Sequence, residues 1–113
     1  MPRRLKYPPY VVVRIPRDMV EVYETNILDL VFGENGDMAR RIVDYIKKNE
    51  RIYPDEYKEI IKDSSERMRY YRTLRKMISL GMLKRGKDGS YILSDEFALK
   101  LGAMIEKWRA ILR

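Results

Sequence analysis

A chain of 113 residues without cysteine or histidine has room for one domain with a modest core, and its composition excludes disulfides, thiolate chemistry and the usual zinc, copper and haem ligands. Its net charge is +7, 36% of its residues are charged, and no apolar run is long enough for a signal peptide or a membrane span. We therefore expect a cytoplasmic protein with no cofactor and no small-molecule ligand. The high charge and the absence of glutamine also favour a thermophilic source.

The positive charge is concentrated in two segments of the chain. Residues 64–90 carry eight basic and two acidic residues, and residues 1–9 carry three basic residues and no acidic one. By contrast, residues 10–63 carry nine basic and twelve acidic residues. Charge placed on one part of a protein attracts a polyanion, so this balance favours nucleic acid as the partner.

The basic arm at residues 1–9 contains three prolines and is not expected to fold alone. Its cations are candidates for contacts with the backbone or minor groove of DNA, as in other basic arms. A solubilising tail explains the same composition equally well. The cations of the arm are Arg3, Arg4 and Lys6.

An N-terminal extension, residues 10–36, is expected to contain one strand and one helix. The β-branched, apolar run Tyr10–Ile15 predicts a short strand that Pro16 ends. Apolar residues at helical spacing predict a single helix over Asp18–Val31. The run Gly33–Gly36 then predicts a turn.

The core, residues 37–94, is expected to contain three helices and a β-hairpin. Asp37 is a suitable N-cap for the first of these helices, and Asp63 with Glu66 resembles a capping box at the start of the third. Gly81 is placed to end that third helix. The expected elements are helices over 37–49, 54–62 and 65–80 and a hairpin over Met82–Leu93.

In the helix over 65–80, the spacing of Tyr71, Leu74 and Ile78 predicts the buried face. A polar and basic stripe then lies nearly opposite and suits the major groove, where arginine bonds guanine bidentately. A solvated charged face is the alternative, but such faces alternate in sign, whereas this helix carries one acid, Glu66. The candidate DNA contacts are Ser65, Arg67, Arg69, Arg72, Thr73 and Lys76.

The tip of the hairpin is also basic. Lys84, Arg85 and Lys87 cluster there, and Gly86 and Gly89 permit the positive φ that tight turns need. These cations are candidates for contacts with phosphates or the minor groove. An edge hairpin that uses lysines to block aggregation is the alternative.

The order of three helices followed by a basic hairpin resembles the winged helix-turn-helix family of DNA-binding proteins, of the type found in regulators of archaea and of their viruses and plasmids. The resemblance implies a mostly α fold with a small β-hairpin (α+β), in which the third helix is the recognition helix and the hairpin is the wing. It also implies sequence-specific binding of double-stranded DNA by a dimeric transcription regulator. Two features depart from the family: the turn Ile61–Ser64 lacks the common glycine, and the second helix is acidic.

A module that binds an acidic protein in a transcription or replication assembly is the alternative, and non-specific binding of RNA or chromatin is a third. A specific regulator alone discriminates between duplexes of different sequence.

The last segment, residues 95–113, is expected to form a helix over 95–112 that begins after Ser94. A helix of about 18 residues is roughly 27 Å long and would extend beyond a small core. We therefore expect its distal apolar residues to form a homodimer, with packing onto the same chain as the alternative. The candidate interface residues are Leu101, Met104, Ile105, Trp108, Ile111 and Leu112.

Two runs imitate catalytic motifs. The run Gly81–Asp88 matches the phosphate-binding pattern G-x-x-x-x-G-K, but Asp88 stands where a Mg²⁺-binding Ser or Thr belongs, and a hairpin follows in place of a helix. The run Pro54–Lys58 imitates the acidic cluster of a nuclease, but one short helix cannot bring such groups together on a metal. We therefore expect no enzymatic activity.

Overall fold

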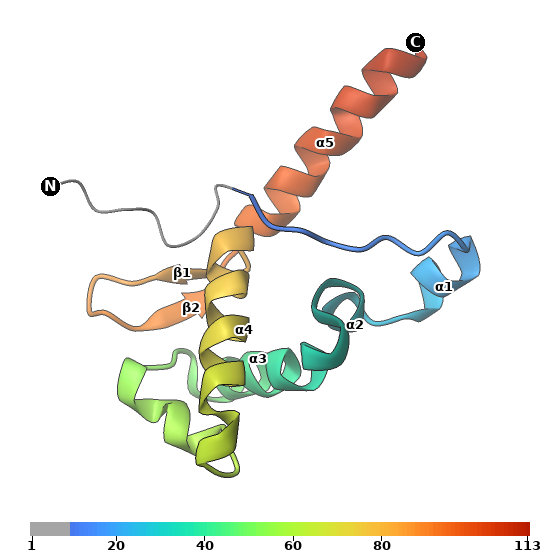
Figure 1. The fold of residues 1–113 in the computed structure, drawn as a ribbon. Coiled ribbons are helices and arrows are strands. Elements are labelled where there is room, and N and C mark those ends of the chain that lie inside the picture. Colours follow the sequence, from blue (N-terminus) through green and yellow to red (C-terminus); the bar gives the residue numbers. More distant parts are fainter. Residues whose placement is uncertain (1–9) are drawn as a thin grey trace, which may run out of the picture.

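The computed structural model describes residues 10–113, so Arg3, Arg4 and Lys6 lie outside the described residues. The protein is mostly helical, with a two-stranded antiparallel hairpin and a long C-terminal helix (Figure 1). The helices are α1 (Met19–Glu24), α2 (Ile27–Phe32), α3 (Gly36–Asn49), α4 (Arg67–Leu80) and α5 (Glu96–Leu112), the 3₁₀ helices are η1 (Gly33–Asn35), η2 (Pro54–Glu59) and η3 (Ser64–Glu66), and the strands are β1 (Leu83–Arg85) and β2 (Tyr91–Leu93).

The core lies where α3 runs across behind α4 (Figure 1). Met38, Ile42 and Ile46 recur at helical spacing along α3 and are buried against residues of α4 such as Met77. Each such side chain stabilises the fold by about 1.5–3 kcal/mol. α2 closes one end of this core with Val31 and Phe32.

The hairpin is tied to the helices by a short backbone pairing. Within the hairpin, Leu83 pairs with Leu93 and Arg85 with Tyr91. Ile52, just after α3, forms an isolated antiparallel bridge with Tyr91, with N–O distances of 3.0 and 2.9 Å. Because Ile52 is also fully buried, this bridge fixes the position of β2 relative to the end of α3.

Gly81 ends α4, as the sequence predicts. Its φ is +92°, which a residue with a side chain rarely adopts, and a Cβ atom there would lie 2.8 Å from Cβ of Glu96. The carbonyl of Gly81 accepts a hydrogen bond from the backbone N–H of Phe97 at 3.0 Å. The start of α5 therefore packs directly on the end of α4, and the rest of α5 projects away from the body (Figure 1).

This projection makes the protein elongated. Its radius of gyration is 15.8 Å, whereas a compact domain of this length has about 13 Å.

Two predictions for the N-terminal extension are wrong. Tyr10–Ile15 is not a strand, because it has no hydrogen-bonded neighbour strand among the described residues, and Val11 packs against the core instead. The single helix is divided into α1 and α2. The division falls at Asn26, whose side chain accepts a hydrogen bond from the backbone N–H of Leu28 at 2.8 Å and so starts a new helix.

Three details of the core helices also differ from the predictions. α3 begins at Gly36 with Asn35 as its N-cap, so Asp37 lies inside the first turn. The short helix over 54–62 is the 3₁₀ helix η2. The capping box is absent in its expected form, because the carboxylate of Glu66 accepts from the backbone N–H of Lys62, at 2.7 Å, and not from that of Asp63.

Candidate nucleic-acid interface

Helix α4 turns a different face to the body from the one that the sequence predicts. Tyr71 and Ile78 are half-buried, and the centre of the buried face is displaced by roughly 100° around the helix axis. Thr73, a predicted DNA contact, is therefore 2% exposed, and its hydroxyl has no hydrogen-bond partner among the described residues. The buried residues of α4 are Tyr70, Thr73, Leu74, Met77 and Leu80.

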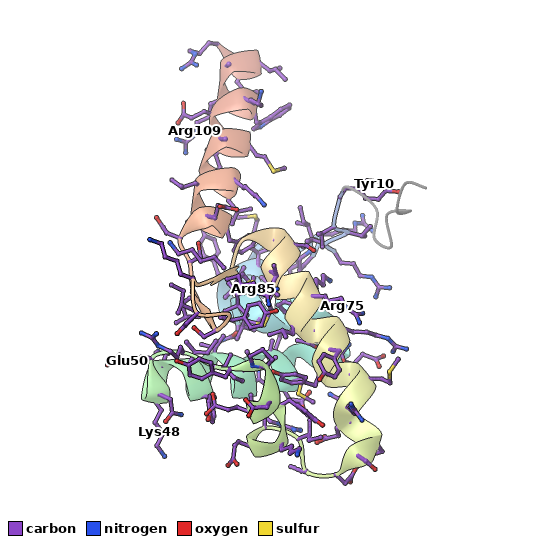
Figure 2. The ribbon with its side chains drawn as sticks, turned by 90° about the vertical axis from the view of Figure 1, so that its left-hand side faces the viewer. Tyr10, Lys48, Glu50, Arg75, Arg85 and Arg109 are labelled. Atoms are coloured by element: carbon purple, nitrogen blue, oxygen red, sulfur yellow. The ribbon has the colours of Figure 1, made fainter. Side chains whose placement is uncertain are left out.

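An outward stripe runs along the opposite side of α4. Its members recur every three or four residues, beginning one turn before the helix, and all of them are exposed. Only Ser65 and Arg72 of this stripe were among the DNA contacts predicted from the sequence. The stripe adds a second arginine, Arg75, which is labelled in Figure 2. The outward stripe consists of Ser65, Met68, Arg72, Arg75 and Ser79.

Arg69, another predicted DNA contact, is half-buried and is held against the body by an ionic network. Its guanidinium donates to Asn35 at 3.0 Å and to Asp37 at 2.8 Å, and lies 3.5 Å from the carboxylate of Glu66. Arg41 donates two hydrogen bonds of 3.0 Å to Glu66 and a third of 3.1 Å to Asp37. The network joins α3 to the start of α4, so the role of Arg69 in the structure is to position the helix.

The same network changes the acidity of Glu66. Hydrogen bonds from Arg41 and from the backbone N–H of Lys62 lower the pKa of Glu66 from its ordinary value of 4.5 to about 2. Glu66 is therefore ionised throughout the neutral range, and its charge is already neutralised by two arginines.

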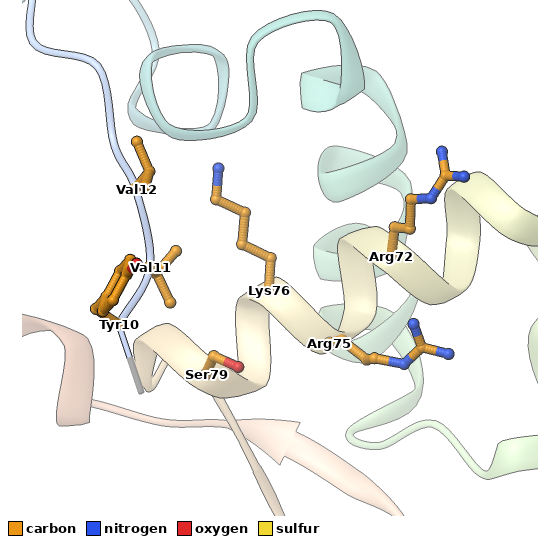
Figure 3. A pocket seen from close by; sticks show the side chains of 7 residues that line it. All are labelled: Tyr10, Val11, Val12, Arg72, Arg75, Lys76 and Ser79. Atoms are coloured by element: carbon orange, nitrogen blue, oxygen red, sulfur yellow. The ribbon is translucent and has the colours of Figure 1, made fainter. Parts of the chain in front are cut away.

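Lys76 is likewise turned toward the body. Its ammonium group donates a hydrogen bond of 2.8 Å to the carbonyl of Val31 at the end of α2 and lies 5.2 Å from the ring centre of Phe32. Burial, together with the charge of Arg14, lowers the pKa of Lys76. Figure 3 shows this side chain leaning away from Arg72 and Arg75. Lys76 thus holds α2 against α4. The prediction that Lys76 belongs to an outward, DNA-contacting stripe is wrong.

The hairpin places its cations at the surface, as the sequence predicts. Lys84, Arg85 and Lys87 are exposed, and Gly89 has a φ of +86° in the turn between the strands. The positive φ also expected at Gly86 is wrong. The acid of the tip, Asp88, accepts hydrogen bonds from Arg51 at 3.1 Å and from Tyr53 at 3.0 Å.

These contacts make Asp88 a structural residue. Hydrogen bonds from the hydroxyl and the backbone N–H of Ser90, with those from Tyr53 and Arg51, hold the pKa of Asp88 far below its ordinary range. Its charge is balanced by Arg51, so the field at the tip is that of the three exposed cations.

On the same side of α4 as the hairpin lies η2 (Figure 1). Arg67 sits with its guanidinium carbon 5.3 Å from the ring centre of Tyr57, which belongs to η2. The carboxylate of Glu56 accepts from the hydroxyl of Tyr45 at 2.8 Å and from the backbone N–H of Tyr53 at 2.7 Å. Asp55 remains exposed at the start of η2. Most cations of this surface therefore lie on α4 and the hairpin, and η2 adds the exposed Lys58 beside its acids.

A shallow groove of about 350 Å³ lies between α4 and the N-terminal segment (Figure 3). One wall consists of Tyr10, Val11 and Val12, and the other includes Arg72 and Arg75. At least 60 residues of sequence separate these two walls, so only the fold brings aromatic and basic groups together here.

The predicted interface residues of α5 are exposed within the described chain. No residue of α5 is buried, and Trp108 is 59% exposed. α5 is attached through Phe97, which packs against the core, and through Lys100, whose ammonium group donates to the carbonyl of Ser79 at 3.2 Å.

Two further features of the described residues bear on the kind of site. Within residues 10–113, no helix combines the length and the apolar character of a membrane span. The same residues contain no cluster of three or more His, Cys, Asp or Glu side chains that could hold a metal ion.

The comparisons with known proteins identify a family. A family model described as an archaeal family matches residues 22–113. The chain therefore belongs to this archaeal family, which agrees with the resemblance to proteins of archaea and of their viruses and plasmids. No curated protein matches the chain, and no solved structure matches it.

Proposed function

We propose that this protein binds double-stranded DNA as a winged helix-turn-helix regulator, with the outward stripe of α4 in the major groove and the hairpin as the wing. The observation that carries the proposal is the placement of exposed cations. Arg72 and Arg75 on α4 and Lys84, Arg85 and Lys87 on the hairpin are all exposed. Among the described residues, Arg72, Lys84 and Lys87 form none of the ion pairs, which involve other side chains.

The order of elements supports this fold assignment. From α3 the chain passes through the bridge at Ile52, then η2, then α4, and then β1 and β2. The bridge adds a third extended segment beside the hairpin, on the edge formed by Tyr91. A helix, a short pairing segment, two helices and a hairpin in this order fit the winged helix-turn-helix arrangement.

Binding of DNA would follow from charge and shape. An α-helix with its side chains is about 10–12 Å across and enters a major groove of about 12 Å width. Arg72, near the middle of the outward stripe, would then reach a base edge, and a bidentate bond to guanine discriminates by about 1–3 kcal/mol. Lys84 and Lys87 would contact phosphates, which adds affinity without sequence preference.

Regulation by this protein would consist of occupancy of a site and would need no catalysis. The run Gly81–Asp88, which imitates a phosphate-binding loop, forms β1 and the hairpin turn. Two copies joined through α5 would place two recognition helices on one duplex, and a separation of about 34 Å would match one turn of DNA.

A protein-binding module is the second candidate, because the outward stripe includes Met68, which is 62% exposed. An exposed methionine between arginines also suits an acidic, partly apolar protein surface. Non-specific binding of RNA or chromatin rests on the same cations as specific DNA binding.

Fluorescence anisotropy with a labelled random-sequence duplex, measured at several salt concentrations, tests the proposal. We expect the logarithm of the affinity to fall linearly with the logarithm of the salt concentration. Lys84→Ala or Lys87→Ala should reduce the slope by about one unit for each phosphate that the variant no longer neutralises. The control is Lys48→Ala, which removes the same charge from the side of the molecule away from α4 (Figure 2).

Selection of binding sites from random duplexes then separates the three candidates. A specific regulator enriches one motif, whereas a chromatin or RNA binder enriches none and competes equally with unrelated sequences. Absence of duplex binding in low salt would remove the DNA proposal and leave the protein-binding module.

A further inference from the structure

Most large apolar residues of α5 follow a heptad pattern, with Leu99 outside it. Their spacing of four, three, four and three residues is that of the a and d positions of a coiled coil. The first of them, Phe97, packs on the core of its own chain, whereas the others are 40% to 71% exposed. Ile105 and Leu112 follow the d residues and widen the stripe at the e positions. The heptad residues are Phe97, Leu101, Met104, Trp108 and Ile111.

The charges beside the heptad residues favour a parallel pair of such helices over an antiparallel pair. Lys100 and Lys107 occupy the g positions, and no acid occupies an e or g position from Lys100 to Leu112. In an antiparallel pair, g positions face g positions, so lysine would lie against lysine. In a parallel pair, each g position faces an e position, so the stems of Lys100 and Lys107 would cover Ile105 and Leu112 of the other copy.

An apolar groove adjoins the same stripe. It has a volume of about 520 Å³ and is lined mainly by apolar side chains of the N-terminal segment, α1, α2 and the first turns of α5. Val13, Ile15 and Val22 form part of its wall, and Leu101 and Met104 belong both to the groove and to the heptad. A helix seated on the stripe would therefore also cover the mouth of the groove.

The exposed apolar area of α5 approaches the area that each partner of a stable pair contributes. With about 200 Å² for a large side chain in full exposure, the six predicted interface residues of α5 leave roughly 700 Å² uncovered, and a stable interface needs about 800 Å² from each partner. The apolar walls that the N-terminal segment, α1 and α2 give to the groove would add to this area.

We propose that two copies of this chain pair through α5 in parallel, with the N-terminal half of each α5 against the groove of the other copy. This inference deepens the proposed pairing and does not depend on DNA binding. In Figure 1, the groove elements α1 and α2 lie on one side of α4 and the hairpin lies on the other. Parallel pairing therefore keeps both α4 and hairpin surfaces at one end of the assembly, free of the interface.

Disulfide formation by single-cysteine variants tests the geometry directly, because the chain contains no cysteine. Two cysteines bridge only when their Cα atoms lie within about 7 Å. The variants are Ile111→Cys at the distal d position, Leu101→Cys at the proximal a position, and Glu106→Cys on the opposite side of the helix as the matched control. Each full-length variant is oxidised in a glutathione buffer at tens of micromolar, separated on a non-reducing gel, and checked for folding by circular dichroism.

Parallel pairing predicts that Ile111→Cys links to itself in most chains, that Glu106→Cys does not, and that the linked protein still binds duplex if the proposed function is right. An antiparallel pair would instead link Ile111→Cys to Leu101→Cys in a mixture, with little self-linkage of either. That result, or linkage of Ile111→Cys no greater than that of Glu106→Cys, would overturn the proposal. Failure to bind DNA with normal linkage would overturn the proposed function alone.

Discussion

The two faces of α4 carry similar side chains and do different things. On the inward side, Arg69 and Lys76 are bound to oxygen atoms of Asp37, Asn35 and Val31. On the outward side, Arg72 is exposed to solvent. A count of cations on a helix therefore overstates its capacity for nucleic acid, because some of those cations hold the helix in place. The proposed function depends on the outward stripe and the hairpin, whereas Arg69 and Lys76 fix the orientation of α4.

The largest effect is expected from the two methionines of the helix, which form a matched pair. Met77 is fully buried and Met68 is 62% exposed. Met77→Ala should lower the free energy of unfolding by about 2–5 kcal/mol because it leaves a cavity, whereas Met68→Ala should change it by less than about 0.5 kcal/mol. Urea unfolding followed by circular dichroism measures both. Equal losses would mean that α4 is not oriented as described.

Two arginines of α4 separate binding from stability. Arg72→Ala should weaken binding of the preferred duplex by about 1–3 kcal/mol if the side chain contacts a guanine, and should leave stability unchanged. Arg69→Ala should do the opposite: it lowers the midpoint of thermal unfolding, since Asp37 and Asn35 each lose a hydrogen bond and Asp37 keeps only Arg41 of its two arginines, and it leaves the affinity of the folded protein within twofold. Anisotropy titrations and thermal melts on both variants give the four values. If Arg69→Ala loses as much affinity as Arg72→Ala, Arg69 contacts DNA, as the sequence predicted, and the account of the two faces of α4 is wrong.

Thr73 provides a smaller test of the inward face. Its buried hydroxyl lacks a hydrogen-bond partner among the described residues, so Thr73→Val should raise the free energy of unfolding by about 1 kcal/mol. Because the side chain does not reach the surface, duplex affinity should stay the same. Destabilisation by this substitution, or a loss of affinity, would show that the hydroxyl has a role beyond the packing seen in the structure.

The smallest effect is the dependence of stability on acid. Glu66 has a pKa of about 2 in the folded protein and an ordinary value of 4.5. The unfolded chain therefore binds the proton more readily, and the contribution of Glu66 is complete above pH 4.5 and is lost as the pH falls toward 2. The thermal midpoint of the wild type should fall over this range, and that of Glu66→Gln should start lower and fall less. Parallel curves for the two proteins would assign the acid sensitivity to other carboxylates.

The sequence predicts those elements whose signals are local. The hairpin and the end of α4 follow from glycines that take positive φ at Gly81 and Gly89. α3 and α5 follow from long apolar repeats and agree with the prediction to within a residue. The N-terminal strand failed because a β-branched run becomes a strand only beside another strand, and the sequence does not show where such a neighbour lies.

Helical spacing alone did not determine which face of α4 is buried. Tyr71, Leu74 and Ile78 form one apolar stripe, and Tyr70, Leu74 and Met77 form another that shares a member with it. The second is buried because it meets α3. Glu66 lies three residues before Arg69 and was visible to helical pairing rules. The two hydrogen-bond partners of Arg69, Asp37 and Asn35, lie 32 and 34 residues away and were beyond the reach of such rules. One signal was available in the sequence. If Asn35 takes the N-cap position of α3, the carboxylate of Asp37 is free to bind a cation elsewhere in the fold, as it does with Arg69.

Nuclear magnetic resonance mapping of the surface that duplex DNA contacts would test the proposed interface without any substitution. Amide shifts of the labelled protein are followed during titration with a short duplex in low salt. We expect shifts on the outward turns of α4 around Arg72 and Arg75 and at the hairpin tip around Lys84 and Lys87, with residues 104–112 of α5 unchanged. Shifts confined to α5 and the N-terminal segment, or none at all, would contradict the assignment of α4 and the hairpin as the DNA-binding surface.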